Sequence, residues 1–175
     1  MTAPEFSRPE RLETIGTVER SVSITASDAE RAALAARFGL VAIDRLEAAF
    51  RIRAEAAGVV ARGTVSAKVV QACSVTDEPL PVTLREDVAL RFVDEDDAST
   101  DEIELAEDAL DTMFYSGPAI DLGEAAAETM ALALDPFPRG PNAAAALAAA
   151  GVISEDEFRP ANAFSDLKAR MAEKS

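Results

Sequence analysis

Residues 46–69 read LEAAFRIRAEAAGVVARGTVSAKV, and two alternating patterns meet within this stretch at Gly58. From Leu46 to Ala54 every second residue is apolar, and the residues between them are mostly charged. From Val59 to Val69 apolar residues largely alternate with Arg, Thr, Ser and Lys. A period of two is typical of half-buried strands, and a glycine between two such strands favours a tight turn. The stretch therefore predicts an antiparallel hairpin with one apolar and one polar face.

The segments on either side of this hairpin complete an α+β pattern. Upstream, Thr17–Thr25 alternate like a strand, and Ser27 with Glu30 forms a capping-box pattern that opens a helix ending at Gly39. Downstream, Val82–Phe92 resume the alternation and predict a third strand of a meander. We therefore expect an α+β fold, in which an antiparallel β-meander or partly closed sheet of about four to six strands packs against two or three helices.

A further helix is expected after these strands. Asp121 and Glu124 form a second capping-box-like start, and the apolar pattern that follows stops at Asp135-Pro136, because proline ends a helix. Before this helix, residues 94–111 are densely acidic and contain no basic residue, which predicts a mobile, solvated loop. We expect residues 1–138 to form a single domain that includes this loop.

The C-terminal part predicts a tether and a tail. Residues 139–159 are alanine-rich and then acidic, which favours a linker with at most a short helix. Residues 160–175 form a basic, amphipathic pattern, and Asn162 is placed to cap a tail helix there. Phe164 and Leu167 would dock that helix, either on the chain's own core or in the groove of a partner.

The net charge of −15 is concentrated in one part of the chain. Residues 1–93 hold 12 Lys or Arg against 13 Asp or Glu, residues 94–158 hold 1 against 17, and residues 159–175 hold 4 against 2. Phosphate contacts dominate affinity for nucleic acids, so direct binding to RNA requires that the basic residues cluster on one face. Without such a cluster, a basic protein is the better partner.

Composition and pattern also limit location and chemistry. The longest apolar run, Ala143–Ile153, is far shorter than the roughly 20 residues that span a bilayer, and no export signal opens the chain. Histidine is absent, which excludes Ser/His/Asp and Cys/His catalysis. We expect a cytoplasmic protein with no membrane contact, no enzyme activity, no cofactor and no small-molecule substrate. A carboxylate-based hydrolase is the remaining catalytic alternative.

Two features invite a metal or nucleophile hypothesis. Cys73 lies where the stretch CSVTDEPLP (73–81) interrupts the strand alternation, but a reactive thiol needs a nearby base and a zinc site needs further ligands. We expect a buried small side chain in a turn between two strands. The carboxylates of Asp94–Asp97 and Glu102–Asp111 suit Ca²⁺ or Mg²⁺, but the EF-hand spacing with its central glycine is missing. No metal site is expected.

Four segments, taken in their order along the chain, resemble the YceD family of large ribosomal RNA subunit accumulation proteins. They are VQACSVTDEPLP (70–81) with the strand after it, IDLGE (120–124), LALDP (132–136) and RPANAFSDLK (159–168). The resemblance covers residues 43–138 and 159–170. Phe6–Pro9 together with Glu30–Leu40 resemble the alphaproteobacterial branch.

The resemblance implies a bacterial factor of the cytoplasm that is needed for accumulation of 23S rRNA, hence for assembly of the large ribosomal subunit, and that acts without catalysis. Its partner would be the 50S precursor, contacted through 23S rRNA or through a basic ribosomal protein. The motif residues, which we expect to form one surface from the turn and the second helix, are Cys73, Thr76, Glu78, Pro79, Asp121, Leu122 and Glu124.

This chain departs from the family pattern at two places. Many members have Cys-x-x-Cys in the turn and a later cysteine after the proline-rich helix end, whereas this chain has Cys73 with Thr76 and no second cysteine. Any zinc role of relatives therefore does not carry over. Ala163 replaces the proline of the tail motif, which weakens the inference that the tail binds the same partner in the same way.

The basic residues of the first half alternate on the predicted strands. Arg51 and Arg53 share a face, as do Arg62 and Lys68. The residues expected to contact RNA or a protein partner are Arg51, Arg53, Arg62, Lys68, Arg85 and Arg91, with Arg45 beside them and Lys168 and Arg170 in the tail. The alternative function is that of an acidic adaptor, or an inhibitor that mimics nucleic acid, bound to a basic protein.

Overall fold

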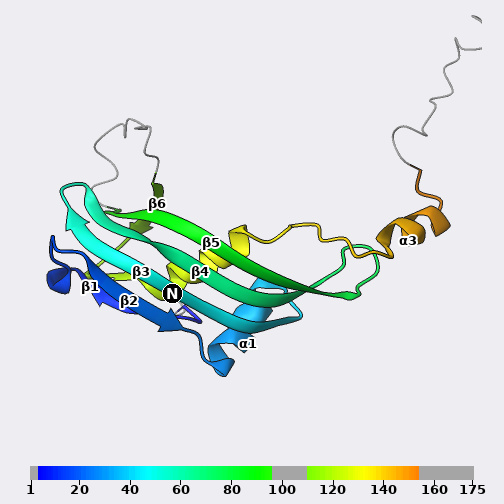
Figure 1. Cartoon of the computed structure of the whole chain (residues 1–175), viewed down its shortest axis with the longest axis horizontal. Coiled ribbons are helices and arrows are strands. Elements are labelled where there is room, and N and C mark those ends of the chain that lie inside the picture. The colour runs from blue at the N-terminus through cyan, green and yellow to red at the C-terminus, as the bar shows by residue number, and fades with distance from the viewer. Residues whose placement is uncertain (1–3, 96–109, 154–175) are drawn as a thin grey trace, which may run out of the picture.

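The computed structural model describes residues 4–95 and 110–153, and one long twisted sheet dominates them (Figure 1). The sheet has five strands in the order β2-β3-β4-β5-β6, and a separate pair is formed by β1 and β7. The strands are β1 Pro9–Arg11, β2 Arg20–Thr25, β3 Ala42–Glu55, β4 Gly58–Ala72, β5 Pro79–Asp94, β6 Asp111–Tyr115 and β7 Ala119–Asp121. The helices are α1 Asp28–Phe38, α2 Leu122–Leu132 and α3 Ala143–Ala149, with a 3-10 turn at Leu12–Thr14.

The predicted hairpin is confirmed as β3 and β4. The two strands are antiparallel, and Glu55 pairs with Gly58 at the turn. Their inward residues are buried as the alternation predicts, and they include Leu46, Phe50, Ile52, Val65 and Val69. This apolar face packs against α2, which lies behind the sheet in the view of Figure 1. Amphipathic strands therefore bury one face and leave the other free.

The sheet is mixed and open, which corrects the expected antiparallel or partly closed meander. The last strand, β6, runs parallel to β5, with Leu90 paired to Asp111 and Asp94 paired to Tyr115. Residues 95–110 separate the two strands in the sequence, which satisfies the requirement of parallel pairing for a connection of about a dozen residues or more. The outer strands, β2 and β6, do not pair with each other.

Both predicted helix starts are confirmed by their caps. The hydroxyl of Ser27 accepts the Glu30 N–H, and the Glu30 carboxylate accepts the Ser27 N–H at 2.7 Å, which completes a capping box for α1. Helix α1 ends at Gly39 in the left-handed conformation, with φ +65°. For α2, the carboxylate of Asp121 accepts the N–H groups of Gly123 and Glu124. These caps satisfy helix N–H groups that have no partner within the helix.

The N-terminal segment is an integral part of the fold, which the alternation did not predict. Phe6 is completely buried in the main core, and β1 pairs with β7. This pairing places the residues before β1 against the start of α2. A short segment without alternation gives no local signal, so its position depends on remote contacts, with Asp121 more than 110 positions away and with Glu30 22 positions away.

The predicted linker contains a short helix, α3, at the end of the extended segment that follows α2 (Figure 1). That segment contacts the β4–β5 turn, since the Ser74 N–H donates to the Pro138 carbonyl at 2.8 Å and the Gln71 side chain donates to the Asp135 carbonyl at 2.9 Å. No helix within the described ranges is long and apolar enough to cross a membrane. The expected tail helix (160–175) and residues 96–109 of the expected acidic loop lie outside those ranges.

Candidate functional site

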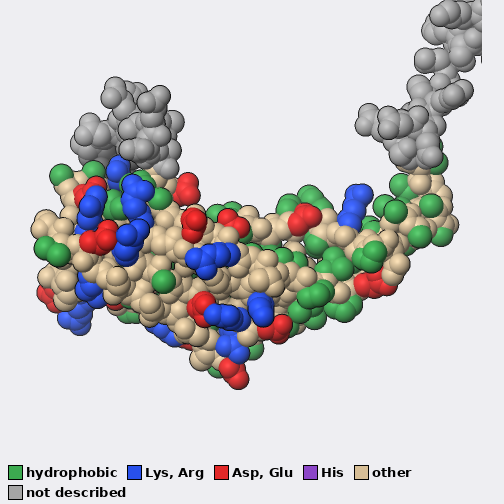
Figure 2. Space-filling model, in the orientation of Figure 1, with side chains coloured by type: hydrophobic (Ala, Val, Ile, Leu, Met, Phe, Trp, Pro, Cys, Tyr) green, Lys and Arg blue, Asp and Glu red, His purple; other side chains and the backbone are tan. Residues whose placement is uncertain are grey.

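The structure brings the expected basic contact residues of the first half together on the sheet face opposite α2. Strand register decides this placement, because side chains of directly paired residues point to the same face. Arg51 pairs with Arg62, and Arg53 and Arg91 both pair with Val60. Farther along the sheet, Lys68 pairs with Arg45, and Arg85 pairs with Ser66. Figure 2 shows Lys and Arg side chains distributed over this face.

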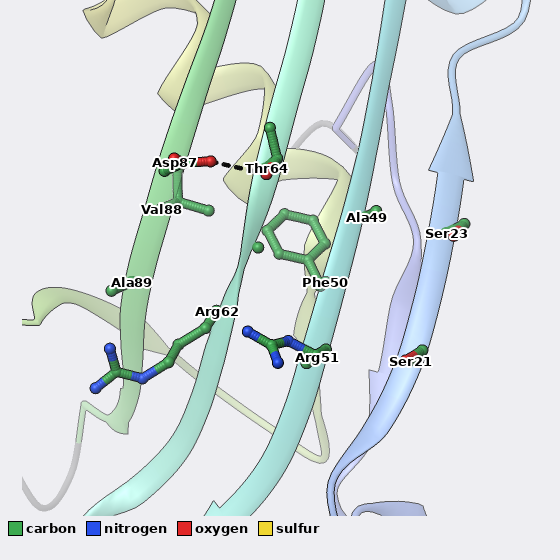
Figure 3. A pocket seen from close by; sticks show the side chains of 11 residues that line it. Ser21, Ser23, Ala49, Phe50, Arg51, Arg62, Thr64, Asp87, Val88 and Ala89 are labelled. Carbon is green, nitrogen blue, oxygen red and sulfur yellow. Dashed lines mark hydrogen bonds between the residues drawn. The ribbon is translucent and has the colours of Figure 1, made fainter.

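This outer face is hollowed between its basic residues. One hollow of about 720 Å³ lies beside Arg51 and Arg62, and a second of about 350 Å³ lies beside Arg85. They share Ser23, Ala49 and Thr64, so they form one continuous depression across β2 to β5, which we call the outer trough. Figure 3 shows its larger half, with small side chains on the strands and two guanidinium groups at one end.

Gly63 accounts for the close approach of two strands at the centre of the outer trough. A Cβ at this position would lie 2.0 Å from the Ala49 carbonyl oxygen and 2.9 Å from its carbonyl carbon. These are backbone atoms, so no rotamer change relieves the contact. The absence of a side chain lets β3 and β4 lie close together, as glycine in a strand does elsewhere.

The charges on the outer face fall into two classes. Some arginines form an ion pair with a nearby carboxylate of the chain, namely Arg45 with Glu47, Arg53 with Glu55 at 2.6 Å, and Arg51 with Glu19 at 3.7 Å. Within the described part of the chain, the side chains of Arg62, Lys68 and Arg85 form no hydrogen bond or ion pair, and these residues are held by backbone pairing alone. Their charge is available to an external partner. The Nε atom of Arg91 is buried and also lacks a hydrogen-bond partner there.

Besides Glu19 and Glu55, two further carboxylates lie among these cations. Asp87 accepts a hydrogen bond of 2.8 Å from the hydroxyl of Thr64, near the middle of the outer trough (Figure 3). Glu47 lines the smaller hollow and pairs with Arg45. The outer face therefore carries an excess of positive charge although the whole chain has a net charge of −15.

The turn that carries Cys73 connects β4 and β5, as expected, and Cys73 is completely buried. Its sulfur accepts the N–H of Gly140 at 3.3 Å. Hydrogen bonds from Gly140, then Thr76 and Val75, lower the pKa of the thiol from 9.0 to about 7, because they favour the thiolate. Across residues 4–95 and 110–153, no three His, Cys, Asp or Glu side chains are grouped so that they could hold a metal ion.

The remaining turn residues attach the segment after α2. The Thr76 hydroxyl donates to Glu78 at 3.1 Å, and the side chain of Asn142 donates to the other Glu78 oxygen at 2.9 Å. Pro79 begins β5 and pairs with Ala72. These contacts hold the turn against residues 138–142, at the end of the sheet nearest α3 (Figure 1).

The structure does not bring the turn and the start of α2 together as one surface. Asp121, Leu122 and Glu124 lie at the N-terminal end of α2, and the helix is about 16 Å long at 1.5 Å per residue. The turn instead contacts the segment beyond the C-terminal end of the helix. Leu122 is completely buried, so it supports the core.

Asp121 and Glu124 belong to a set of ion pairs and hydrogen bonds that we call the N-terminal clamp. The side chains of the clamp are those of Ser7, Arg8, Glu30, Arg37, Asp121 and Glu124. Asp121 accepts hydrogen bonds from the Ser7 hydroxyl at 2.5 Å and the Arg8 N–H at 2.8 Å. Arg8 reaches Glu30 at 2.7 Å, and Arg37 reaches Glu124 at 2.6 Å. The clamp joins the N-terminal segment, α1 and α2.

The contacts of the clamp shift the pKa values of two of its side chains, those of Glu30 and Arg37. The hydrogen bond from Arg8, together with the Ser27 cap, lowers the pKa of Glu30 from 4.5 to about 2, although desolvation opposes the shift. Hydrogen bonds to Glu124 and Glu5 raise the pKa of Arg37. The alternation patterns do not predict the ion pairs of Arg8 and Arg37, because the partners of these residues are remote in the sequence.

The tail residues Asn162, Phe164, Leu167, Lys168 and Arg170 lie outside the described residues.

Comparison with known proteins supplies one match. A family model described as "Large ribosomal RNA subunit accumulation protein YceD" matches residues 61–169. No curated protein and no solved structure matches the chain. The matched region includes most of β4, all of β5, the Cys73 turn and α2, and its range contains all four segments that resemble the family.

Proposed function

Because this chain belongs to the YceD family, whose description names accumulation of large-subunit ribosomal RNA, we propose that it is a ribosome biogenesis factor. It is needed for accumulation of 23S rRNA and for assembly of the large subunit. It acts in the cytoplasm by binding the 50S precursor, and it performs no chemical step on it. The absence of histidine from the sequence supports a binding role.

One observation supports direct contact with rRNA more than any other. Three cations of the outer face are uncompensated: Arg62 and Lys68 lie on β4, and Arg85 lies on the adjacent strand β5. Arg62 and Arg85 line the outer trough, and Lys68 lies two residues beyond Ser66 of its lining. Phosphate groups bind such cations with release of counterions, which is the dominant source of affinity in protein–RNA contacts. An acidic chain can bind RNA directly only if its basic residues cluster on one face, and the basic residues of the outer face have such an arrangement.

The function is tested in cells by deletion of the gene and by sucrose-gradient fractionation of a tagged protein. We expect less 23S rRNA, a smaller 50S peak, and comigration of the tagged protein with large-subunit precursors. Unchanged 23S rRNA and 50S profiles after deletion would overturn the proposal. Crosslinks mapped in the comigrating fraction then separate contact through rRNA from contact through a basic ribosomal protein.

A second candidate function rests on the charge of the C-terminal half. Residues 94–158 carry 17 acidic residues and 1 basic residue, a density that can mimic nucleic acid toward a basic protein. Under this alternative the chain is an adaptor or inhibitor. Affinity capture that returns one basic protein and no ribosomal component would favour it over the ribosomal function.

A further inference from the structure

From the outer trough we propose, on the basis of the ribosomal function above, that this chain binds double-stranded RNA across its minor groove. Cations at the two ends of the trough contact the two phosphate strands, and the hydroxyl-bearing centre contacts 2′-hydroxyl groups. Nothing in the family description specifies the form of RNA or the surface that holds it. The inference therefore deepens the proposed function and names its ligand class.

The cations of the outer face form two groups that are separated along the strands, as contact with two phosphate strands requires. One group contains Arg51, Arg53, Arg62 and Arg91, and the other contains Arg45, Lys68 and Arg85. Arg62 and Lys68 lie on the same strand, and at roughly 3.3 Å per residue they are about 20 Å apart along β4. A single phosphate strand that follows one cation row does not need two separated groups. A duplex lying across the sheet presents two strands at once.

The centre of the outer trough, between the Arg51–Arg62 pair and Arg85, carries the hydroxyls of Ser23 and Thr64 and no Lys or Arg. Further hydroxyls flank it, from Ser21 beside Arg51 and from Thr25 and Ser66 toward Arg85. Asp87 lies there as well, and a carboxylate repels phosphate but accepts a hydrogen bond from a 2′-hydroxyl. The wide, shallow minor groove of A-form RNA displays 2′-hydroxyls between its two phosphate strands. The order of cation, hydroxyl with carboxylate, and cation across the trough matches that surface.

The trough lacks the groups with which proteins read single-stranded RNA. Surfaces for single strands stack bases on exposed aromatic side chains. Among the described residues, the only aromatic one that borders the trough is Phe50, which is 1% exposed because its ring belongs to the core. The surface therefore offers phosphate and sugar contacts without base stacking, which favours a duplex over a single strand.

Fluorescence anisotropy with the full-length protein tests the proposal directly. The probes are a duplex RNA of about 20 base pairs, long enough to present successive minor grooves, the DNA duplex of the same sequence, and one RNA strand alone. We expect the RNA duplex to bind at least tenfold more tightly than either other probe, an estimate of about 1.4 kcal/mol. Equal affinity for RNA and DNA duplexes, or tighter binding of the single strand, contradicts the proposal.

Charge reversal locates the binding surface. The double variant Arg62→Glu, Lys68→Glu removes one cation from each group, so the slope of log affinity against log salt should fall by about 2. The control Arg11→Glu, Arg139→Glu makes the same charge change at residues outside strands β2 to β5, which form the outer face, and it should keep the wild-type slope. Equal losses in both double variants would show that net charge alone governs binding, which overturns the assignment to the trough.

The central residues test recognition of the 2′-hydroxyl. The double variant Thr64→Val, Asp87→Ala removes a hydroxyl and a negative charge, so affinity for DNA should rise while the RNA-to-DNA affinity ratio falls toward 1. An unchanged ratio contradicts the sugar contact. A purely electrostatic role of Asp87 moves both affinities together and leaves that ratio intact.

Failure of this inference can be distinguished from failure of the proposed function. If the purified protein binds no duplex RNA even at low salt, yet still comigrates with 50S precursors, the RNA inference is wrong and the ribosomal function stands through a protein contact. If the protein does not comigrate and deletion leaves 23S rRNA unchanged, the ribosomal function itself is wrong.

Discussion

The N-terminal clamp and the outer trough both contain arginines, but the side chains of these arginines differ in their partners. In the clamp, Arg8 and Arg37 bind carboxylates from other elements at 2.7 Å and 2.6 Å. In the trough, Arg51 contacts Glu19 only at 3.7 Å, and the side chains of Arg62 and Arg85 have no such partner among the described residues. The role of a basic residue here therefore follows from the carboxylates that the fold places beside it, which composition does not reveal.

Substitution of side chains in the two regions should also affect different properties, namely stability for the clamp and binding for the outer trough. Clamp contacts join the N-terminal segment to α1 and α2, so they contribute to the free energy of unfolding. Uncompensated cations on an exposed face contribute little to folding and mainly affect binding. Substitutions in both regions, and at the close strand contact at Gly63, test this contrast.

Gly63→Ala should be the most damaging single change, because a Cβ there overlaps the Ala49 carbonyl. Separation of β3 from β4 should cost about 3 kcal/mol or more, as strain at a close backbone contact does. Chemical denaturation measures the loss. The control Gly16→Ala meets no atom nearer than 3.9 Å and should change the free energy of unfolding by less than about 0.5 kcal/mol. Equal effects of both changes would show that the strands do not depend on Gly63.

Asp121→Ala should cost about 2 kcal/mol, because it removes the cap of α2 and the hydrogen bonds to Ser7 and Arg8 together. Amide hydrogen exchange should show faster exchange in β1 and the first turn of α2. Asp28→Ala is the matched control, since that side chain is 99% exposed and lies in the first turn of α1. A loss no larger than that of the control contradicts the clamp.

Arg8→Met should lower stability at neutral pH by about 1 kcal/mol, since its pair with Glu30 is partly exposed. The pKa of Glu30 is about 2 in the folded protein against an ordinary value of 4.5, so the stabilisation is present above pH 4.5 and is lost as the pH falls toward 2. Denaturation of both proteins between those pH values should show the difference shrinking. A difference that is constant across this range excludes a role for ionised Glu30.

Cys73→Ser should lower the melting temperature by only a few degrees, because a hydroxyl can accept the Gly140 N–H but fills the buried space less well than sulfur. Function in the deletion strain should remain near that of the wild type. Complete loss of function in a folded Cys73→Ser protein would show that the thiol itself is required.

Arg62→Met should have the smallest effect on stability, below about 0.5 kcal/mol, because the side chain is exposed. Thermal unfolding measures it, and Arg37→Met is the comparison from the clamp. A loss as large as that of Arg37→Met would show that Arg62 has a structural role, and it would remove the contrast between the two regions.

Local signals predicted the elements that local interactions define. The β3–β4 hairpin and the two helix starts follow from alternation and from caps within three residues. The parallel strand β6 and the N-terminal strand β1 were missed, because their partners lie outside any local window. Alternation also grouped the basic residues within each strand, but it did not relate one strand to another.

Sequence alone was enough to predict which residues of each strand are polar, where α1 and α2 begin, and which family the chain resembles. These properties depend on side-chain periodicity and on short-range hydrogen bonds. The pairing of Arg62 with Arg51 at one end of the outer trough, and of Arg8 with Glu30 in the clamp, follows from the three-dimensional fold. Strand register and the close approach at Gly63 set these contacts, because they bring together side chains that no sequence spacing relates.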